Sequence, residues 1–288
     1  MGIDLGKVTT EVKEIAPGIV IYSLADLGKS TFLARLVKDV PDSILFQCGE
    51  SSLSNLLEDD QKGVPHYPDI IGGGGTPEEI CENYLDFCDL LMQLDEPDEC
   101  PYTLIAFDNI DNIINFNMSD YVIENFYEGD MGKANGWGNK KVVEMVQQTS
   151  LILQYLTSLR SKGVTIVLSL HSRIIPHTDP LGEEYDTYSL ALPTTKRASV
   201  TELFVNWATQ LMFGTLDVVT AKNKDSNNKK ATAGQRVLMC APHPAYVVKN
   251  KFRLPDKFTF DYDVFKKYMW GEPEEEKKVI PPKKKGKK

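Results

Sequence analysis

The stretch GIVIYSLADLGKSTFLARLV, residues 18–37, contains the strongest local signal in the chain. Its first part, GIVIY, is typical of a buried strand, and the segment that starts with STFLARLV has the apolar spacing of an amphipathic helix. Between them lies the second half of the phosphate-binding pattern G-x-x-x-x-G-K-[ST], formed by Gly28, Lys29, Ser30 and Thr31. Ser23 replaces the first glycine of that pattern. The order of strand, loop and helix favours a nucleotide site that tolerates Ser23, and a plain strand–turn–helix with an exposed lysine is the alternative.

Such a loop binds phosphate because successive backbone N–H groups and the N-terminus of the helix face the anion. In this arrangement Lys29 would reach the β- and γ-phosphates of ATP, and the Ser30 hydroxyl would bind Mg²⁺. Gly28 occupies the more demanding of the two glycine positions, and it is intact. Asp26 brings a carboxylate close to the expected phosphates, so it must point outward for a nucleotide to bind.

A second acidic position follows in YTLIAFDNID, residues 102–111, where an apolar strand ends in Asp108. Ligands of a parallel sheet gather at the carboxyl ends of its strands, so Asp108 is expected to lie near Lys29. A carboxylate in that place would hold Mg²⁺ through water. Asp111 is a weaker candidate for the same role, and capping of the next turn is the other interpretation of this residue.

Short apolar runs alternate with longer amphipathic stretches along the chain, which predicts a mostly parallel sheet covered by helices. Further strands are predicted at residues 43–48, 102–107 and 164–171, and helices at residues 76–94 and 142–163. The first of these helices has a predicted capping box, with Thr76 as its N-cap, Pro77 in the first turn and Glu79 three residues after the cap. The segments RVLMCAP and AYVVKNKF, between residues 236 and 252, are predicted to pair with each other as an antiparallel hairpin. Irregular structure is predicted at residues 60–75, 115–140, 174–198 and 221–235.

Composition limits the class of protein. The chain has 288 residues, of which 42% are hydrophobic and 25% charged, as expected of a soluble globular protein in the cytoplasm. Its five cysteines form no C-x-x-C pair and its four histidines are scattered, so no zinc site is predicted. The net charge of −9 disfavours a surface that is basic throughout. The division into domains is predicted to be a core at residues 1–268 and a disordered, Lys-rich tail at residues 269–288.

The order of these features resembles the core of RecA-type ATPases: the P-loop, a strand followed by Glu50, a strand ending in Asp108, a strand ending in His171, and the late segment VVKNK. More narrowly, the chain resembles phage-encoded AAA ATPases described as RecA-like single-strand annealing proteins, over about residues 15–268. The resemblance implies an α/β, RecA-type P-loop NTPase core with a twisted, mostly parallel sheet. It also implies that ATP and Mg²⁺ are the cofactors.

The resemblance also assigns roles to individual residues. Glu50 would activate the attacking water, and His171 would sense the γ-phosphate where RecA itself has glutamine. Lys249 and Lys251 would enter the ATP site of a neighbouring subunit and stabilise charge in the transition state. Each residue has a structural alternative. Glu50 could be a solvated loop carboxylate, His171 a buried structural residue, and the lysines the charged face of an edge strand.

RecA-type proteins bind DNA through two mobile loops, and the chain offers a candidate for each. MGKANGWGNKK, residues 131–141, contains Trp137 for base stacking and three lysines for phosphates, Lys133, Lys140 and Lys141. An ordinary surface loop with Trp137 packed inward is the alternative. The second region, residues 172–197, carries Tyr185, Tyr188, Lys196 and Arg197 but also several acids, and is the weaker candidate.

The resemblance therefore implies an ATP-hydrolysing protein of phage recombination or replication, in the host cytoplasm, that anneals or binds single-stranded DNA. Its active form would be a homo-oligomer, either a ring or a filament, and a single-strand-binding protein is a further partner that the family suggests. No membrane association is expected, because no apolar run is long enough to span a bilayer. Two alternatives remain open: a DNA-binding clamp that responds to ATP without hydrolysing it, and a P-loop motor of another process.

Overall fold

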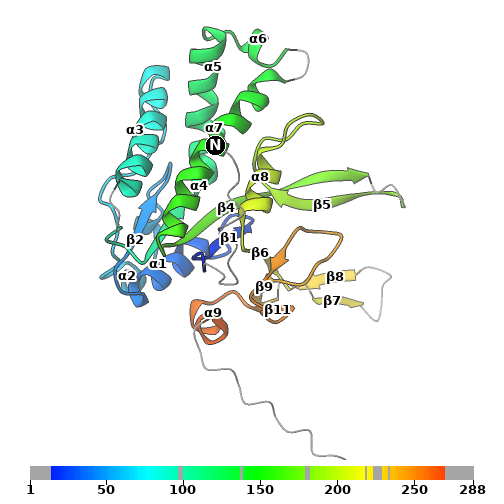
Figure 1. The fold of residues 1–288 in the computed structure, drawn as a ribbon. Coiled ribbons are helices and arrows are strands. Elements are labelled where there is room, and N and C mark those ends of the chain that lie inside the picture. Colours follow the sequence, from blue (N-terminus) through cyan, green and yellow to red (C-terminus); the bar gives the residue numbers. More distant parts are fainter. Residues whose placement is uncertain are drawn as a thin grey trace, which may run out of the picture.

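The computed structural model describes residues 14–96, 100–136, 139–178, 182–217, 219–222, 229–232 and 234–269. The predicted charged tail lies outside these residues, apart from Met269 at the end of the last helix. Within them, a nine-stranded sheet forms the centre of the fold, in the order β11-β9-β6-β1-β4-β3-β2, with β10 also paired to β6 and β5 to β4 (Figure 1). Five neighbouring strands are parallel: β1 (Gly18–Ser23), β2 (Ser43–Gln47), β3 (Leu104–Asp108), β4 (Thr165–Thr178) and β6 (Gln210–Leu216). The predicted α/β class with a mostly parallel sheet is confirmed.

The predicted antiparallel C-terminal strands are confirmed, except that the segments at residues 236–242 and 245–252 do not pair with each other as a hairpin. Both segments pair with β6 instead of with each other. The last four residues of β6 pair with β9 (Arg236–Met239), and its first two pair with β10 (Lys249–Asn250), so the two strands follow one another along a single edge. β11 (Lys257–Thr259) is the antiparallel neighbour of β9 on its other side.

Helices cover both faces of the sheet, because alternate residues of each strand point to opposite faces. Ile19 and Ile21 of β1 pack with α1 (Lys29–Asp39) and α9 (Tyr262–Met269). Val20 and Tyr22 belong to the opposite core, which receives side chains from the longer helices. These are α3 (Pro77–Asp95), α5 (Ser119–Tyr127), α7 (Lys140–Ser161) and α8 (Val200–Trp207). The short helix α2 (Glu58–Gln61) lies beside α1.

The predicted start of α3 is confirmed in detail. The Thr76 hydroxyl accepts a hydrogen bond from the Glu79 N–H at 3.3 Å, and Glu79 Oε2 accepts one from the Thr76 N–H at 2.8 Å. Pro77 occupies the first helical position, where no backbone donor is needed. The four glycines before it, residues 72–75, thus lead into a capped helix.

Three of the four regions predicted to be irregular contain regular structure. The described part of residues 115–140 is largely helical: a π-helix at Ile113–Met118, which follows α4 (Ile110–Asn112), leads into α5, and α6 (Met131–Ala134) comes next. Residues 174–198 contain the second half of β4 and the returning strand β5 (Glu184–Leu190), which together form a projecting hairpin (Figure 1). β7 (Val219–Lys222) and β8 (Lys229–Thr232) form a second hairpin. The second half of β4 is exposed or half-buried, and β5, β7 and β8 are edge strands, so their sequences lack the apolar pattern from which strands are predicted. No helix among the described residues is long and apolar enough to cross a membrane.

Ser23, the residue that replaces a glycine in the motif, is accommodated by its neighbour in the sheet. It is fully buried at the end of β1, where it pairs with Gly214 of β6 on one side and His171 of β4 on the other. A Cβ atom built on Gly214 would come within 2.9 Å of the Ser23 Cβ and 2.6 Å of Phe260 Cε1. The missing side chain at Gly214 therefore provides the space that Ser23 fills.

We predict that Gly214→Ala destabilises the fold by about 1–3 kcal/mol, because the added methyl group has no room between Ser23 and Phe260. Chemical denaturation measures the change in the free energy of unfolding. Gly74→Ala is the matched control, since a Cβ atom there would meet no atom within 4 Å. Equal stability of the two variants would show that the packing at Gly214 is not tight.

Candidate nucleotide-binding site

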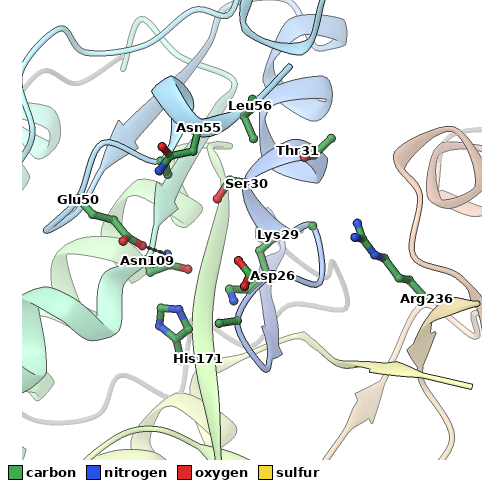
Figure 2. Close-up of a pocket in the computed structure, with 13 residues that line it drawn as sticks. Asp26, Lys29, Ser30, Thr31, Glu50, Asn55, Leu56, Asn109, His171 and Arg236 are labelled. Carbon is green, nitrogen blue, oxygen red and sulfur yellow. Dashed lines mark hydrogen bonds between the residues drawn. The ribbon is translucent and has the colours of Figure 1, made fainter. Parts of the chain in front are cut away.

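The P-loop lies between β1 and α1, at the carboxyl ends of the parallel strands. Gly28 has the left-handed backbone angle φ of 97° and directly precedes the first residue of α1, so the loop turns there into the helix. A cavity of about 360 Å³ opens over the loop (Figure 2). Side chains from both sides of β1 line it, including Ser30, Thr31, Glu50, Asn109, His171 and Arg236. The structure thus brings most of the residues predicted for the nucleotide site to one cavity.

Lys29 is buried at the base of this cavity, with 5% of its surface exposed. Its Nζ donates hydrogen bonds to Ser23 Oγ at 3.4 Å and to the Leu24 carbonyl at 3.3 Å. Burial lowers the pKa of Lys29, and the nearby carboxylates of Asp108 and Asp111 partly offset that effect. A bound phosphate would favour the charged form further, because opposite charges attract strongly where water is excluded.

Asp108 is fully buried at the end of β3. Its Oδ1 accepts a hydrogen bond from the Ser169 hydroxyl at 2.5 Å, whereas its Oδ2 has no hydrogen-bond partner among the described residues. A buried carboxylate oxygen without a partner fits a ligand that brings its own positive charge or donors, as hydrated Mg²⁺ does. The described residues contain no cluster of three or more His, Cys, Asp or Glu that could hold a metal alone. A site of one carboxylate and the Ser30 hydroxyl is nevertheless typical of Mg²⁺ bound with nucleotide phosphates.

Glu50 follows β2 and reaches the same cavity from an exposed loop. Its Oε1 accepts a hydrogen bond from the side-chain amide of Asn109 at 3.0 Å (Figure 2). Asn109 itself is nearly buried, and the Ser169 hydroxyl lies 2.9 Å from its Oδ1. Asn109 was not among the predicted site residues, although its place after Asp108, at the end of a strand, is the same signal that identified Asp108.

His171 lines the cavity beside the P-loop, since its strand β4 is the direct neighbour of β1. Its Nδ1 lies 2.9 Å from Oδ2 of Asp111, a carboxylate that is almost fully buried. The ring is therefore oriented by Asp111, and a partly exposed histidine faces the space above the loop. Asp111, considered for Mg²⁺ or for capping a turn, contacts this histidine through one of its two oxygens.

Arg236 is a cavity residue that the sequence did not indicate. It begins β9, and its guanidinium would lie 3.4 Å from a Cβ atom placed on Gly28. Figure 2 shows Arg236 on the side of the P-loop opposite to Glu50 and His171. The pairing of β9 with β6 places it there, and this long-range contact leaves no local pattern in the sequence.

Lys249 and Lys251 lie away from the cavity of their own chain. Lys249 pairs with Leu211 at the start of β6, whereas the P-loop lies near the end of that strand. The Lys249 ammonium donates to the carbonyls of Val205, Asn206 and Ala208 at the C-terminus of α8, at 2.6–3.0 Å. Burial lowers the pKa of Lys249, with smaller contributions from the positive charges of Lys251 and Arg160. Lys249 thus stabilises a helix end, and Lys251 is exposed.

The residues predicted to bind DNA lie on helices instead of a loop. Lys133, in α6, forms an ion pair with Glu128 at 3.0 Å, and Lys141 donates to the Ser119 hydroxyl at 3.2 Å. Lys140 is exposed at the first position of α7. Trp137 lies outside the described residues. Within the described part of this region, α6 and the start of α7 are helical, whereas residues 135, 136 and 139 between them are not.

A P-loop, a buried lysine and a buried acidic residue at the ends of parallel strands define a P-loop NTPase core. The family of AAA domains matches residues 16–252, and the chain belongs to this family. The match covers the whole cavity, from the P-loop to Arg236. AAA domains bind and hydrolyse ATP, which agrees with the ligand expected at this site. No curated protein matches the chain.

Lys249 and Lys251 have different contacts, so replacing each of them by alanine should change the free energy of unfolding by a different amount. Lys249→Ala should lower the free energy of unfolding by about 1–2 kcal/mol, since α8 loses its charged C-terminal partner. Lys251→Ala should change it by less than about 0.5 kcal/mol, because the side chain is exposed. Thermal or chemical denaturation of both variants measures the difference. Two equal effects would contradict the capping role of Lys249.

Proposed function

We propose that this protein is a Mg²⁺-dependent ATPase that binds single-stranded DNA as a homo-oligomer in phage recombination or replication. One observation carries the ATPase part: a buried lysine and an exposed glutamate line one P-loop cavity, and the buried Asp108, whose Oδ2 is orphaned among the described residues, is close enough to Lys29 to affect its pKa. These are the groups needed to bind phosphates, hold Mg²⁺ and activate water. The DNA and oligomer parts are supported by the resemblance to RecA-type annealing proteins.

In the proposed reaction, the backbone of residues 28–31 and the Lys29 ammonium hold the phosphates of ATP. Ser30 and Asp108 would hold Mg²⁺, which neutralises charge on the β- and γ-phosphate oxygens. Glu50 orients a water molecule and takes its proton as the water oxygen attacks the γ-phosphorus. The bond from that phosphorus to the bridging oxygen breaks, and ADP and phosphate leave. His171, held by Asp111, would hydrogen-bond the γ-phosphate.

The bond between Asn109 and Glu50 favours one alternative, the clamp that binds ATP without hydrolysing it. If Asn109 held both oxygens of the Glu50 carboxylate away from the water in the ATP-bound protein, no base would reach that water. If the protein is an ATPase, the Glu50 carboxylate has two ways to reach the water. It can break its hydrogen bond to Asn109, or it can keep that bond and contact the water with its second oxygen. Turnover measurements separate these two functions.

The trans-acting role proposed for the late lysines is better suited to Lys251 than to Lys249. Lys251 is exposed and follows β10, so it is accessible to a neighbouring subunit. Lys249 could take this role only by giving up three hydrogen bonds to α8. A ring or a filament would allow the contact, because each subunit then presents this edge to the next cavity.

We predict that Glu50→Gln leaves ATP affinity within about threefold of wild type and lowers turnover at least 100-fold, because the proton acceptor is lost. Lys29→Ala should abolish measurable binding, since the phosphates lose their buried countercharge. Calorimetric ATP titration and phosphate release measure both effects. Glu58→Gln, an exposed change on α2, is the charge-matched control. Normal hydrolysis by Glu50→Gln would mean another base, and undiminished binding by Lys29→Ala would contradict the site.

A salt titration tests the proposed DNA contact at the start of α7. Single-stranded DNA should stimulate turnover, and the double change Lys140→Ala/Lys141→Ala should weaken DNA binding. It should also reduce the slope of log affinity against log salt by about 1.4, at roughly 0.7 per lost phosphate contact. Lys133→Ala should change the slope less, because Glu128 already neutralises Lys133. An unchanged slope in the double variant would place the DNA elsewhere on the protein.

A further inference from the structure

A second cavity, of about 180 Å³, adjoins the phosphate-binding cavity on the far side of the P-loop from Glu50. The two cavities share Gly28, Thr31 and Arg236. The remaining walls come from α1 and from the segment that leads into α9, and consist of Phe32, Arg35, Phe260, Asp261 and Tyr262. A molecule bound over the loop could therefore extend into both cavities without leaving the protein surface.

The positions of the site residues set the direction in which a nucleotide would lie. Glu50, Asn109 and His171 come from the strands on one side of β1, and they form the end of the first cavity suited to the γ-phosphate (Figure 2). Arg236 comes from β9, on the other side of β1. A triphosphate with its γ-phosphate at the first end has its α-phosphate near Thr31, so the nucleoside points toward Arg236 and the second cavity.

We propose that the second cavity receives the base of the bound nucleotide, that Arg236 covers the face of the base, and that Asp261 selects bases with an exocyclic amino group. This inference rests on the proposed ATPase function and deepens it by naming the residues that distinguish one nucleotide from another.

Ordered aromatic side chains lie beneath the second cavity. The ring of Phe32 packs edge-on against those of Phe260 and Tyr262, with centroid distances of 5.7 and 5.9 Å. All three side chains are buried, and the Tyr262 hydroxyl donates to Asp39 at 2.6 Å. A flat, apolar base would thus meet a surface that does not need to reorganise, which favours affinity.

Arg236 can cover such a base because its guanidinium is planar and not engaged elsewhere. Its side chain is exposed and, within the described part of the chain, has no hydrogen bond or ion pair. Guanidinium groups stack on aromatic planes through dispersion and cation–π attraction. Arg35, in contrast, is held by Asp60 at 2.8 Å and by Asp261 at 3.3 Å, so it belongs to the wall of the cavity.

Asp261 provides acceptor capacity at the edge of the cavity. Its Oδ1 accepts from the Asp263 N–H at 2.8 Å, and its Oδ2 contacts Arg35. Each carboxylate oxygen has two lone-pair positions, so one position on each oxygen remains for a further donor. The 6-amino group of adenine is such a donor, whereas the 6-oxo group of hypoxanthine would face the carboxylate with an acceptor. The site should therefore prefer ATP over inosine triphosphate.

Competition of three ligands tests the proposal: ATP, inosine triphosphate and inorganic tripolyphosphate, each titrated into the full chain with Mg²⁺. Arg236→Ala should weaken ATP about tenfold and leave tripolyphosphate within twofold, because only ATP has a base to lose. Asp261→Asn should reduce the preference for ATP over inosine triphosphate at least fivefold. Lys267→Ala, an exposed change on α9 with the same loss of charge as Arg236→Ala, is the control. Thermal melting checks that each variant is folded.

Equal weakening of ATP and tripolyphosphate by Arg236→Ala would overturn the proposal, since Arg236 would then bind phosphate instead of the base. Equal affinity of the wild type for ATP and inosine triphosphate would also overturn it. In both cases the ATPase itself would stand. A wild-type protein that binds neither ATP nor tripolyphosphate would instead contradict the proposed function, so the two failures are distinguishable.

Discussion

The buried ammonium of Lys29 is the constraint on which the rest of the site depends. Burial alone would disfavour its charge, and the lowered pKa of Lys29 reflects that cost. The carboxylate of Asp108, at the end of β3, is the largest opposing influence, and it is also fully buried. Buried charges need well-placed partners. In a complex with nucleotide and Mg²⁺, phosphate would be the partner of Lys29 and the metal would be the partner of Asp108. The unpaired Oδ2 of Asp108 is therefore understandable as part of a site for a charged ligand.

Strand β1 separates the residues proposed to take part in hydrolysis from the residue proposed to cover the base. Strands β2, β3 and β4 lie to one side of β1 and contribute Glu50, Asn109 and His171, whereas β6 and β9 lie to the other side and contribute Arg236. The pairing of β6 with β1 also explains the unusual P-loop, because Gly214 leaves room for Ser23. A serine in the motif is thus matched by a glycine in the next strand, and Ser23 Oγ contributes a contact to Lys29.

Local signals predicted the parts of the structure that depend on neighbouring residues. The P-loop, the strand that ends in Asp108 and the capped start of α3 were all predicted, because each is encoded within about ten residues. Glu50 and His171 required the resemblance to RecA-type ATPases, and the structure does bring both to the cavity. Arg236, the pairing of β9 and β10 with β6, and the contact of Lys249 with α8 depend on residues far apart in the sequence. The helices within residues 115–140 were missed because glycines and polar residues there indicated a loop.

A structure of the protein with Mg²⁺ and a non-hydrolysable ATP analogue would test the central claim most directly. The phosphates should lie on the backbone of residues 28–31, contacted by Lys29, with the metal between Ser30 and the carboxylate of Asp108. The γ-phosphate should lie on the side of Glu50 and His171. A nucleotide bound in another cavity, or an empty P-loop at saturating analogue, would contradict the assignment of this site.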